Sequence, residues 1–262
     1  MRKPVVIVAS AMLALLGSEV WAQQQAWVPP PVKAGQAMSE ARWLFGANYG
    51  FQIGSNDLAY QAVFPLYDEQ ALINASQTLE GGSFFDVSAG YRMGQTFGVA
   101  LAWHTLQNTG DADLTGSLPH PIYFDRPREF TATATELDYD EQAFHVQALW
   151  FVQLSDKLDV AISGGPSFFR MNQQFVRAVA FTEQPPDYAS VTVESVLVDD
   201  LTDNAVGFNA GADFTYAVTS KLGAGVLLRY SRATATFDTG EGQTADVTGG
   251  GFQVAGGVRF RF

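Results

Sequence analysis

The chain has 262 residues, of which 15 are Lys or Arg and 27 are Asp or Glu, and its formal net charge at pH 7 is −12. This acidic balance argues against nucleic acid as a partner, because a phosphate-binding surface needs clustered basic side chains. The sequence has no cysteine, so the stability of the fold must come from sheet closure and side-chain burial instead of disulfides.

The N-terminal residues predict secretion. Arg2 and Lys3 precede an apolar run over residues 5–16, and small residues near Ala22 suit a cleavage site. We expect a signal peptide over residues 1–22; the alternative is a short membrane anchor. Residues 23–40 contain three consecutive prolines and show neither helical nor strand periodicity. We interpret them as a Pro-rich periplasmic lead-in to one domain, residues 41–262.

The sequence of residues 41–262 predicts β-strands. Eight segments alternate bulky apolar side chains on one face with Gly, Ala, Ser or charged residues on the other, namely 43–53, 85–93, 97–104, 144–152, 158–168, 206–218, 222–230 and 252–262. Each has roughly the 10 residues that a tilted strand needs to cross a bilayer. A small soluble barrel would fill its interior with the bulky side chains, but these faces favour the reverse, apolar side chains in lipid and polar ones inside.

The connections support the same interpretation. Short turns of turn-forming residues follow the second, fourth and sixth segments, whereas long connections follow the others. Short periplasmic turns opposite long extracellular loops are typical of outer-membrane barrels. Aromatic residues also gather at two heights, as expected for rings at the two membrane interfaces.

These features resemble a known family. The alternating strands, the segment Ala-Ile-Ser-Gly-Gly-Pro-Ser-Phe-Phe at 161–169 and the ending Arg-Phe-Arg-Phe at 259–262 resemble the small eight-stranded bacterial outer-membrane β-barrels, a group that includes the membrane domain of outer-membrane protein A. The resemblance implies an all-β, transmembrane, antiparallel up-and-down barrel in the outer membrane of a Gram-negative-type bacterium. It also implies that Val258, Phe260 and Phe262 form a signal read by the barrel-assembly machinery.

Charged and histidine side chains fall on the predicted inner face. They include Asp86, Arg92, His104, Glu141, His145, Asp159, Asp213, Arg229, Arg259 and Arg261. Unpaired buried charges are costly, so we predict an interior polar network in which Arg92 and Arg259 meet Asp213, with Asp86 or Glu141 near Arg229. The alternative is a wet lumen that solvates them. Side chains just fill an eight-stranded barrel, which disfavours a general diffusion pore, although inward Gly and Ala leave room for a thin water path.

The same residues allow a second hypothesis, that the protein is an enzyme. Some eight-stranded barrels modify lipid A with a His, a Ser and a carboxylate at the outer rim, where His104, His145 and Glu141 are expected. However, Leu106 and Gln147, not serines, stand two residues after the histidines. Hydrogen-bonded interior histidines are therefore favoured, and we expect no enzyme activity and no cofactor.

Acidic residues gather in the long connections, among them Asp111, Asp113, Asp199, Asp200 and Asp203. Solubility and mutual repulsion explain them; the alternative is that they bind divalent cations or bridge lipopolysaccharide through them. The stretches 131–137 and 190–197 alternate like strands. We expect the wall to continue above the membrane there, with an exposed edge for strand addition. Alternatively, they add a transmembrane pair and make ten strands.

The sequence thus predicts an outer-membrane barrel with a structural, surface-binding or limited-permeability role. The alternatives are a small porin-like channel and a lipid A-modifying enzyme. The expected partners are outer-membrane lipid, lipopolysaccharide and the barrel-assembly machinery.

Overall fold

The computed structural model describes residues 41–262; the predicted signal peptide and lead-in, 1–22 and 23–40, lie outside the described residues. The strands are β1 (Trp43–Ile53), β2 (Ser55–Leu66), β3 (Glu69–Glu80), β4 (Ser83–Arg92), β5 (Phe97–Leu118), β6 (Arg128–Gln153), β7 (Leu158–Glu183), β8 (Val191–Ala217), β9 (Leu222–Gly240) and β10 (Gln243–Arg261). The described residues contain no helix long and apolar enough to cross a membrane.

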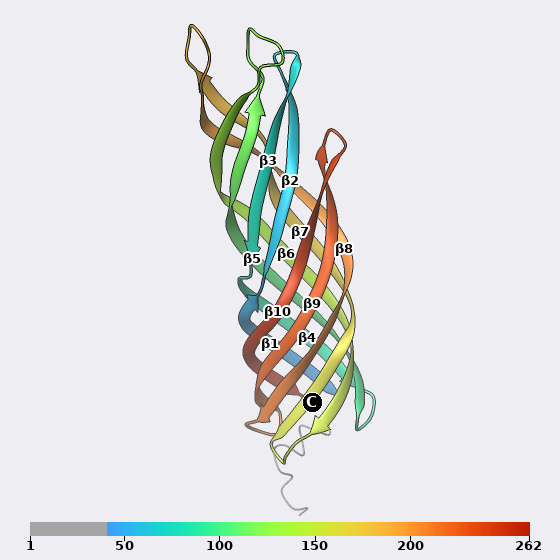
Figure 1. The fold of residues 1–262 in the computed structure, drawn as a ribbon. Helices are drawn as coiled ribbons and strands as arrows, with labels where there is room; N and C mark the ends of the chain where they lie inside the picture. Colours follow the sequence, from blue (N-terminus) through green and yellow to red (C-terminus); the bar gives the residue numbers. More distant parts are fainter. Residues whose placement is uncertain (1–40) are drawn as a thin grey trace, which may run out of the picture. The chain divides into compact units, whose positions relative to one another are not determined.

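Eight of these strands close an antiparallel ring in the order β1, β4, β5, β6, β7, β8, β9, β10 and back to β1 (Figure 1). The closing ladder runs from Leu44 opposite Arg261 to Ile53 opposite Phe252. The backbone amide of Arg42 donates to the carbonyl of Phe262 at 2.8 Å, so the first and last residues of the barrel segment meet at the rim that carries the short turns. The eight-stranded transmembrane barrel predicted from the sequence is confirmed.

A hairpin stands where the sequence predicted only a long loop. β2 and β3 are joined by a tight turn at Tyr67 and Asp68, both with positive φ, 52° and 63°, as a type I′ turn requires. β3 pairs with the outer half of β5, from Leu72 opposite Ser117 to Gln77 opposite Ala112. β4 pairs with the inner half of the same strand. The hairpin therefore extends the wall beyond β1 and β4 without entering the ring.

The strands are also longer than a bilayer requires: β5 to β8 have 22, 26, 26 and 27 residues. The stretch 131–137 lies in the outer part of β6, and all of 190–197 except its first residue lies in the outer part of β8. The prediction that the wall continues above the membrane is confirmed. The alternative of an extra transmembrane pair is wrong, because those stretches prolong strands that already belong to the ring.

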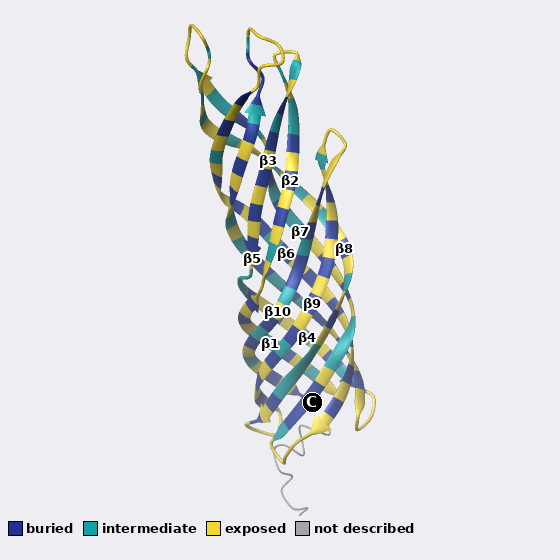
Figure 2. Cartoon of the chain, viewed as in Figure 1, coloured by how far each residue is buried: buried dark blue, intermediate teal, exposed yellow. Residues whose placement is uncertain are grey.

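The polarity of the two faces inverts along a single strand. In the inner half of β6, Val146 points outward and is 42% exposed, whereas His145 is fully buried. In the outer half, Tyr139 and Phe130 are buried and Thr131 is exposed. Figure 2 shows the alternation of buried and exposed positions continuing along the full length of the strands. In the inner half the outward face is apolar, as contact with lipid requires. In the outer half the outward face is polar and the apolar side chains point inward, as contact with water requires.

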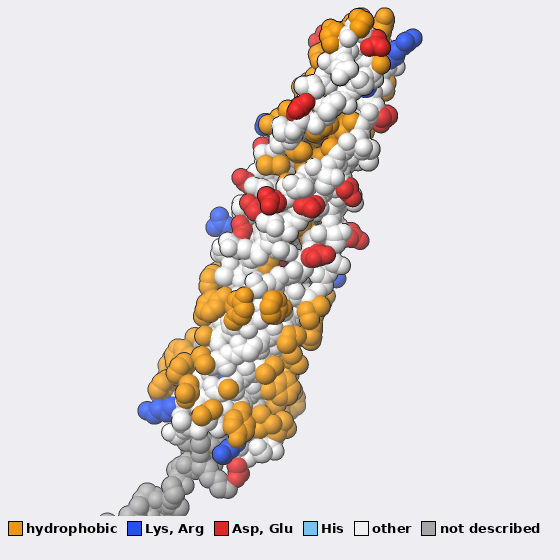
Figure 3. Space-filling view, turned by 90° about the vertical axis from the view of Figure 1, so that its left-hand side faces the viewer, with side chains coloured by type: hydrophobic (Ala, Val, Ile, Leu, Met, Phe, Trp, Pro, Cys, Tyr) orange, Lys and Arg blue, Asp and Glu red, His pale blue; other side chains and the backbone are white. Residues whose placement is uncertain are grey.

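The surface shows the same boundary. Figure 3 shows apolar side chains gathered over the part of the barrel near the short turns, with most acidic side chains on the part beyond it. Exposed aromatic residues mark both edges of the apolar band, among them Trp43 and Tyr216 on one side and Phe144 and Phe168 on the other. Aromatic rings favour such interfacial positions, so the band marks the membrane-spanning part.

Candidate functional site

A polar network crosses the interior of the barrel, and Arg229 of β9 is its centre. The Arg229 guanidinium donates from Nη1 to Asp86 Oδ2 at 2.8 Å and from Nε to Gln253 Oε1 at 2.6 Å. Its Nη2 lies 3.3 Å from His104 Nδ1. Asn48 donates to the other Asp86 oxygen at 2.8 Å. Arg229 is only 1% exposed, and these partners compensate its lost hydration.

A chain of hydrogen bonds leads outward from this centre. His104 Nε2 lies 3.0 Å from Glu141 Oε1, His104 Nδ1 lies 2.9 Å from His145 Nε2, and His145 Nδ1 lies 2.7 Å from Ser167 Oγ. Asn209 Nδ2 donates to Ser167 Oγ at 2.9 Å. One assignment satisfies every contact: neutral histidines with their protons on Nε2, and donation running from Asn209 through Ser167, His145 and His104 to Glu141.

Glu141 is the acceptor at the end of that chain. Besides His104, it accepts from the Tyr139 hydroxyl at 2.7 Å and from the Gly250 backbone amide at 2.8 Å. It is fully buried, so three donors replace the water that its carboxylate has lost.

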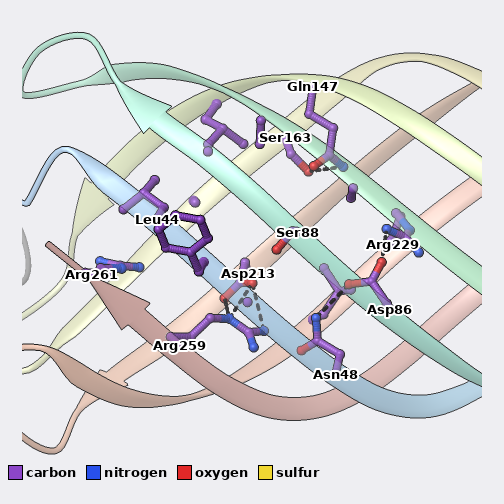
Figure 4. A pocket seen from close by; sticks show the side chains of 18 of the residues that line it. Leu44, Asn48, Asp86, Ser88, Gln147, Ser163, Asp213, Arg229, Arg259 and Arg261 are labelled. Carbon is purple, nitrogen blue, oxygen red and sulfur yellow. Dashed lines mark hydrogen bonds and ion pairs between the residues drawn. The ribbon is translucent and has the colours of Figure 1, made fainter.

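A second group of ion pairs lies nearer the periplasmic rim. Arg259 pairs with Asp213, with Nη2 at 2.8 Å from Oδ2 (Figure 4). Arg261 pairs with Asp159 and donates to Thr215 at 2.9 Å. The predicted meeting of Arg92 with Asp213 is wrong: the charged partner of Arg92 is Asp159, at 3.7 Å. Asp159 faces Thr215 in the β7–β8 ladder, two positions nearer the rim than Asp213, and Arg92 ends β4 at that height.

The structure therefore brings together Arg259 with Asp213, Asp86 with Arg229, and Glu141 with His104, which in turn contacts His145. Glu141 has no direct contact with Arg229 among the described interactions; His104 stands between them. A cavity lies between the two groups, and Figure 4 shows Ser88, Gln147 and Ser163 on its wall. A smaller pocket lies on the outer side of the network and reaches Glu141.

An apolar layer covers the network on its outer side. The rings of Phe84 and Phe169 pack edge-on against His104, with ring centroids 5.9 and 6.2 Å away. Beyond them the outer half of the barrel is filled by a continuous core that includes Leu58, Ile73, Leu106, Leu114, Leu118, Met171, Phe175, Phe237 and Val247. Every one of these side chains is at most 2% exposed. The lumen ends at this layer.

Sequence reasoning missed Ser167, Asn209 and Gln253. The serine was expected on the same strand as each histidine. It comes instead from the neighbouring strand, because His145 and Ser167 are direct partners in the β6–β7 ladder. Counting residues outward from the 154–157 turn would have placed them opposite each other. The amides carry no charge, and a search for charged inward residues passes over them.

Two other predictions concern the surface. Val258, Phe260 and Phe262 point outward and are 44%, 42% and 56% exposed; their recognition by an assembly machinery stays a prediction. Within residues 41–262, no group of three or more His, Asp or Glu side chains is arranged to hold a metal ion. A role for divalent cations between the acidic loops and lipopolysaccharide also stays a prediction.

No protein-family model and no curated protein sequence matches the chain. Among solved structures, the chain is similar to the outer membrane protein OprG from Pseudomonas aeruginosa, with 9% identity, 85% of this chain and 96% of that chain covered, and a TM-score of 0.44. It is also similar to Ail, the attachment invasion locus protein of Yersinia pestis, with 9% identity, 84% and 99% covered, and a TM-score of 0.35. A third is the outer membrane protease OmpT from Escherichia coli, with 6% identity, 84% and 97% covered, and a TM-score of 0.44.

The closed ring, its outward apolar band and its short turns on one rim are the architecture of bacterial outer-membrane barrels. The fold of the chain is therefore that of an outer-membrane β-barrel, and this follows from its own strands and surface.

Proposed function

We propose that this protein is a non-conducting outer-membrane barrel whose wall continues as a filled projection above the membrane, and that its role is structural and surface-binding. The observation that carries the proposal is the apolar core of the outer half. Buried apolar side chains occupy the interior of the outer half, so a solute that moves along the axis of the barrel meets them.

The polar network is the first obstacle to transport. Arg229, His104 and His145 are at most 1% exposed and hydrogen-bonded to one another across the lumen. An ion that passed this level would have to displace groups that satisfy one another.

The apolar core is the second obstacle, and it also supports the binding role. Apolar constrictions exclude water and ions, and here the constriction extends far above the bilayer. A stalk packed to this extent is stiff, because close-packed interiors deform little. Such a projection holds its outer loops at a fixed distance from the cell surface, which suits binding and not diffusion.

The chain of Glu141, His104, His145 and Ser167 contains the residue types of a nucleophile with its base. All four side chains are fully buried, and Phe84 and Phe169 pack over the histidines. Ser167 has no surface exposed to a lipid substrate. These groups therefore serve to hold the barrel together, and we propose no catalytic activity.

Single-channel recording in planar bilayers tests the proposal. The expected record is silent, while a heat-modifiable gel shift of the same preparation shows that the barrel is folded and inserted. Regular conductance steps would overturn the closed barrel in favour of the porin-like alternative. Loss of lipid A acyl chains in cells that express the protein would overturn the absence of catalysis.

A further inference from the structure

The outer end of the projection is built from three loops that are tied together. We call it the tip: residues 119–127 between β5 and β6, the turn at 67–68, and residues 184–190 between β7 and β8. His120 Nε2 donates to the Asp187 carbonyl at 3.0 Å, while His120 Nδ1 accepts from the backbone amides of Ile122 at 3.1 Å and Tyr123 at 3.2 Å. One histidine therefore fixes the start of the first loop to the third.

Arg128 makes a second tie. It is 7% exposed and donates to the Pro119 carbonyl at 2.5 Å, to the Tyr188 carbonyl at 3.1 Å and to Glu183 at 2.6 Å. The Tyr67 hydroxyl donates to the same Glu183 carboxylate at 3.2 Å. All three loops thus share one buried ion pair, which fixes the backbone of the tip.

The apex that these ties support is apolar and faces solvent. Ile122, Tyr123 and Phe124 are consecutive and are 56%, 54% and 70% exposed. Large apolar side chains in water are unfavourable, and the flanking polar ties prevent this loop from folding over them. Exposed apolar surface on a preorganised loop marks an interaction site.

The charges around the apex are mainly acidic. Asp68, Asp125 and Asp187 lie in the tip and Glu69 begins β3 next to it, with Arg126 as the basic neighbour that stacks on Tyr123 at 5.3 Å. The Asp125 backbone amide donates to Glu69 at 3.1 Å, which holds that carboxylate beside the apex. Anionic lipids and polyanions are repelled by such a rim, whereas a zwitterionic headgroup that presents its ammonium outermost is attracted.

We infer that the tip docks into the zwitterionic surface of a facing membrane, with Ile122, Tyr123 and Phe124 entering the headgroup region. The inference deepens the proposed function and rests on it. A stable protein interface buries at least about 1,200 Å², more than three side chains provide. A lipid surface needs no matching recess, and aromatic and aliphatic side chains partition into it individually.

The test uses the full chain in lipid nanodiscs and vesicles of phosphatidylcholine, with co-sedimentation as the measurement. The wild-type protein should bind the vesicles, and the double variant Ile122→Ser, Phe124→Ser should lose about tenfold or more of its partition coefficient. The matched control is Leu197→Ser, Val198→Ser, which removes exposed apolar side chains from β8, away from the tip, and should bind as the wild type does. Equal binding by the tip variant and the wild type would overturn the inference.

A Tyr123→Trp variant provides a second readout that does not depend on the strength of binding. Its difference emission spectrum against the unsubstituted protein should shift to shorter wavelength on phosphatidylcholine vesicles, and adding phosphatidylserine should reduce the shift. An unchanged spectrum would overturn the docking. If binding occurs only on whole cells and protease treatment of those cells abolishes it, the partner is a protein and the inference fails. Channel conductance would overturn the proposed function and leave these measurements unaffected.

Discussion

Arg229 and Asp86 form an ion pair across the lumen, with Nη1 2.8 Å from Oδ2, although their strands β9 and β4 are not neighbours in the ring. Both side chains are 1% exposed. The pair thus connects opposite walls at the level of the membrane, and its removal tests how far the barrel depends on the network.

Removing one partner should destabilise the barrel strongly. Arg229→Met leaves Asp86 buried without its cation, and Asp86→Asn leaves Arg229 without its anion; the expected loss is about 3–5 kcal/mol each. The double variant Arg229→Met, Asp86→Leu removes both charges and should be less destabilised than the sum of the single changes. Urea unfolding in vesicles measures this. Additive losses would show that the two charges act independently.

How much the sequence could predict depends on which solvent each strand meets. The alternation in 43–53 or 144–152 predicted lipid-facing strands because the apolar face is bulky and the other face is small or polar. The β2–β3 hairpin alternates too: Leu58, Tyr60 and Ala62 are buried, whereas Asp57, Ala59 and Gln61 are exposed. That is a soluble strand pattern of opposite polarity, and a search for membrane strands passes over it.

The outer part of β6 shows a second limit. The backbone of Glu136 has a φ of 58°, where the β5–β6 ladder shifts register between Gly110 and Ala112. This bulge reverses which alternate residues of β6 point inward. Leu137 is therefore buried, although strict alternation from the exposed Thr131 would point it outward. The partners of the interior ion pairs are also hard to predict. Arg92 of β4 pairs with Asp159 of β7 because the two strands, which are not neighbours, place these residues at the same height in the barrel. The spacing of residues in the sequence does not give the relative heights of such strands.

The inversion of polarity along β6 predicts two different costs for one substitution. Val146→Arg places a charge on the lipid-facing band and should destabilise the barrel by about 2–4 kcal/mol. Thr131→Arg, also outward on the same strand but beyond the membrane, should change stability by less than about 0.5 kcal/mol. Urea unfolding of both variants in the same vesicles makes the comparison. Equal effects would mean that the membrane boundary on β6 is misplaced.

The β2–β3 hairpin should be dispensable for the ring and necessary for the projection. Its base is closed by the Gly81 amide, which donates to the Gly54 carbonyl at 2.9 Å, so deletion of residues 55–80 leaves ends that a short link can join. β1 and β4 remain paired from Trp43–Tyr91 to Phe51–Ser83. The variant should still insert and show a heat-modifiable gel shift.

The same deletion uncovers Leu114 and Leu118, which are now 1% and 0% exposed. The outer half should then bind a hydrophobic dye and become sensitive to protease between β5 and β6, while the inner half stays protected. Failure of the variant to insert would show that the hairpin belongs to the folding unit of the ring.

Tyr60 predicts an alkaline limit to the stability of the projection. Its ring packs edge-on against Phe175 at 5.0 Å, and its hydroxyl accepts from the Val176 amide at 2.7 Å. Burial raises the pKa of Tyr60 from 10.0 to about 12, although the Val176 amide acts in the opposite direction. Because the folded pKa is the higher one, the stability from the neutral phenol is complete below pH 10 and is lost as the pH rises toward 12.

Absorbance titration of tyrosinate measures this, with Tyr60→Phe as the reference. The difference between the two proteins should be one tyrosine that titrates near pH 12, and hydrogen exchange at Val176 should accelerate over the same range in the wild type. Tyr60→Phe leaves the Val176 amide without its acceptor, at a cost of about 1–3 kcal/mol, but removes the alkaline dependence. A Tyr60 midpoint at the ordinary value of 10.0 would mean that water reaches the outer core, and the filled projection would then have to be abandoned.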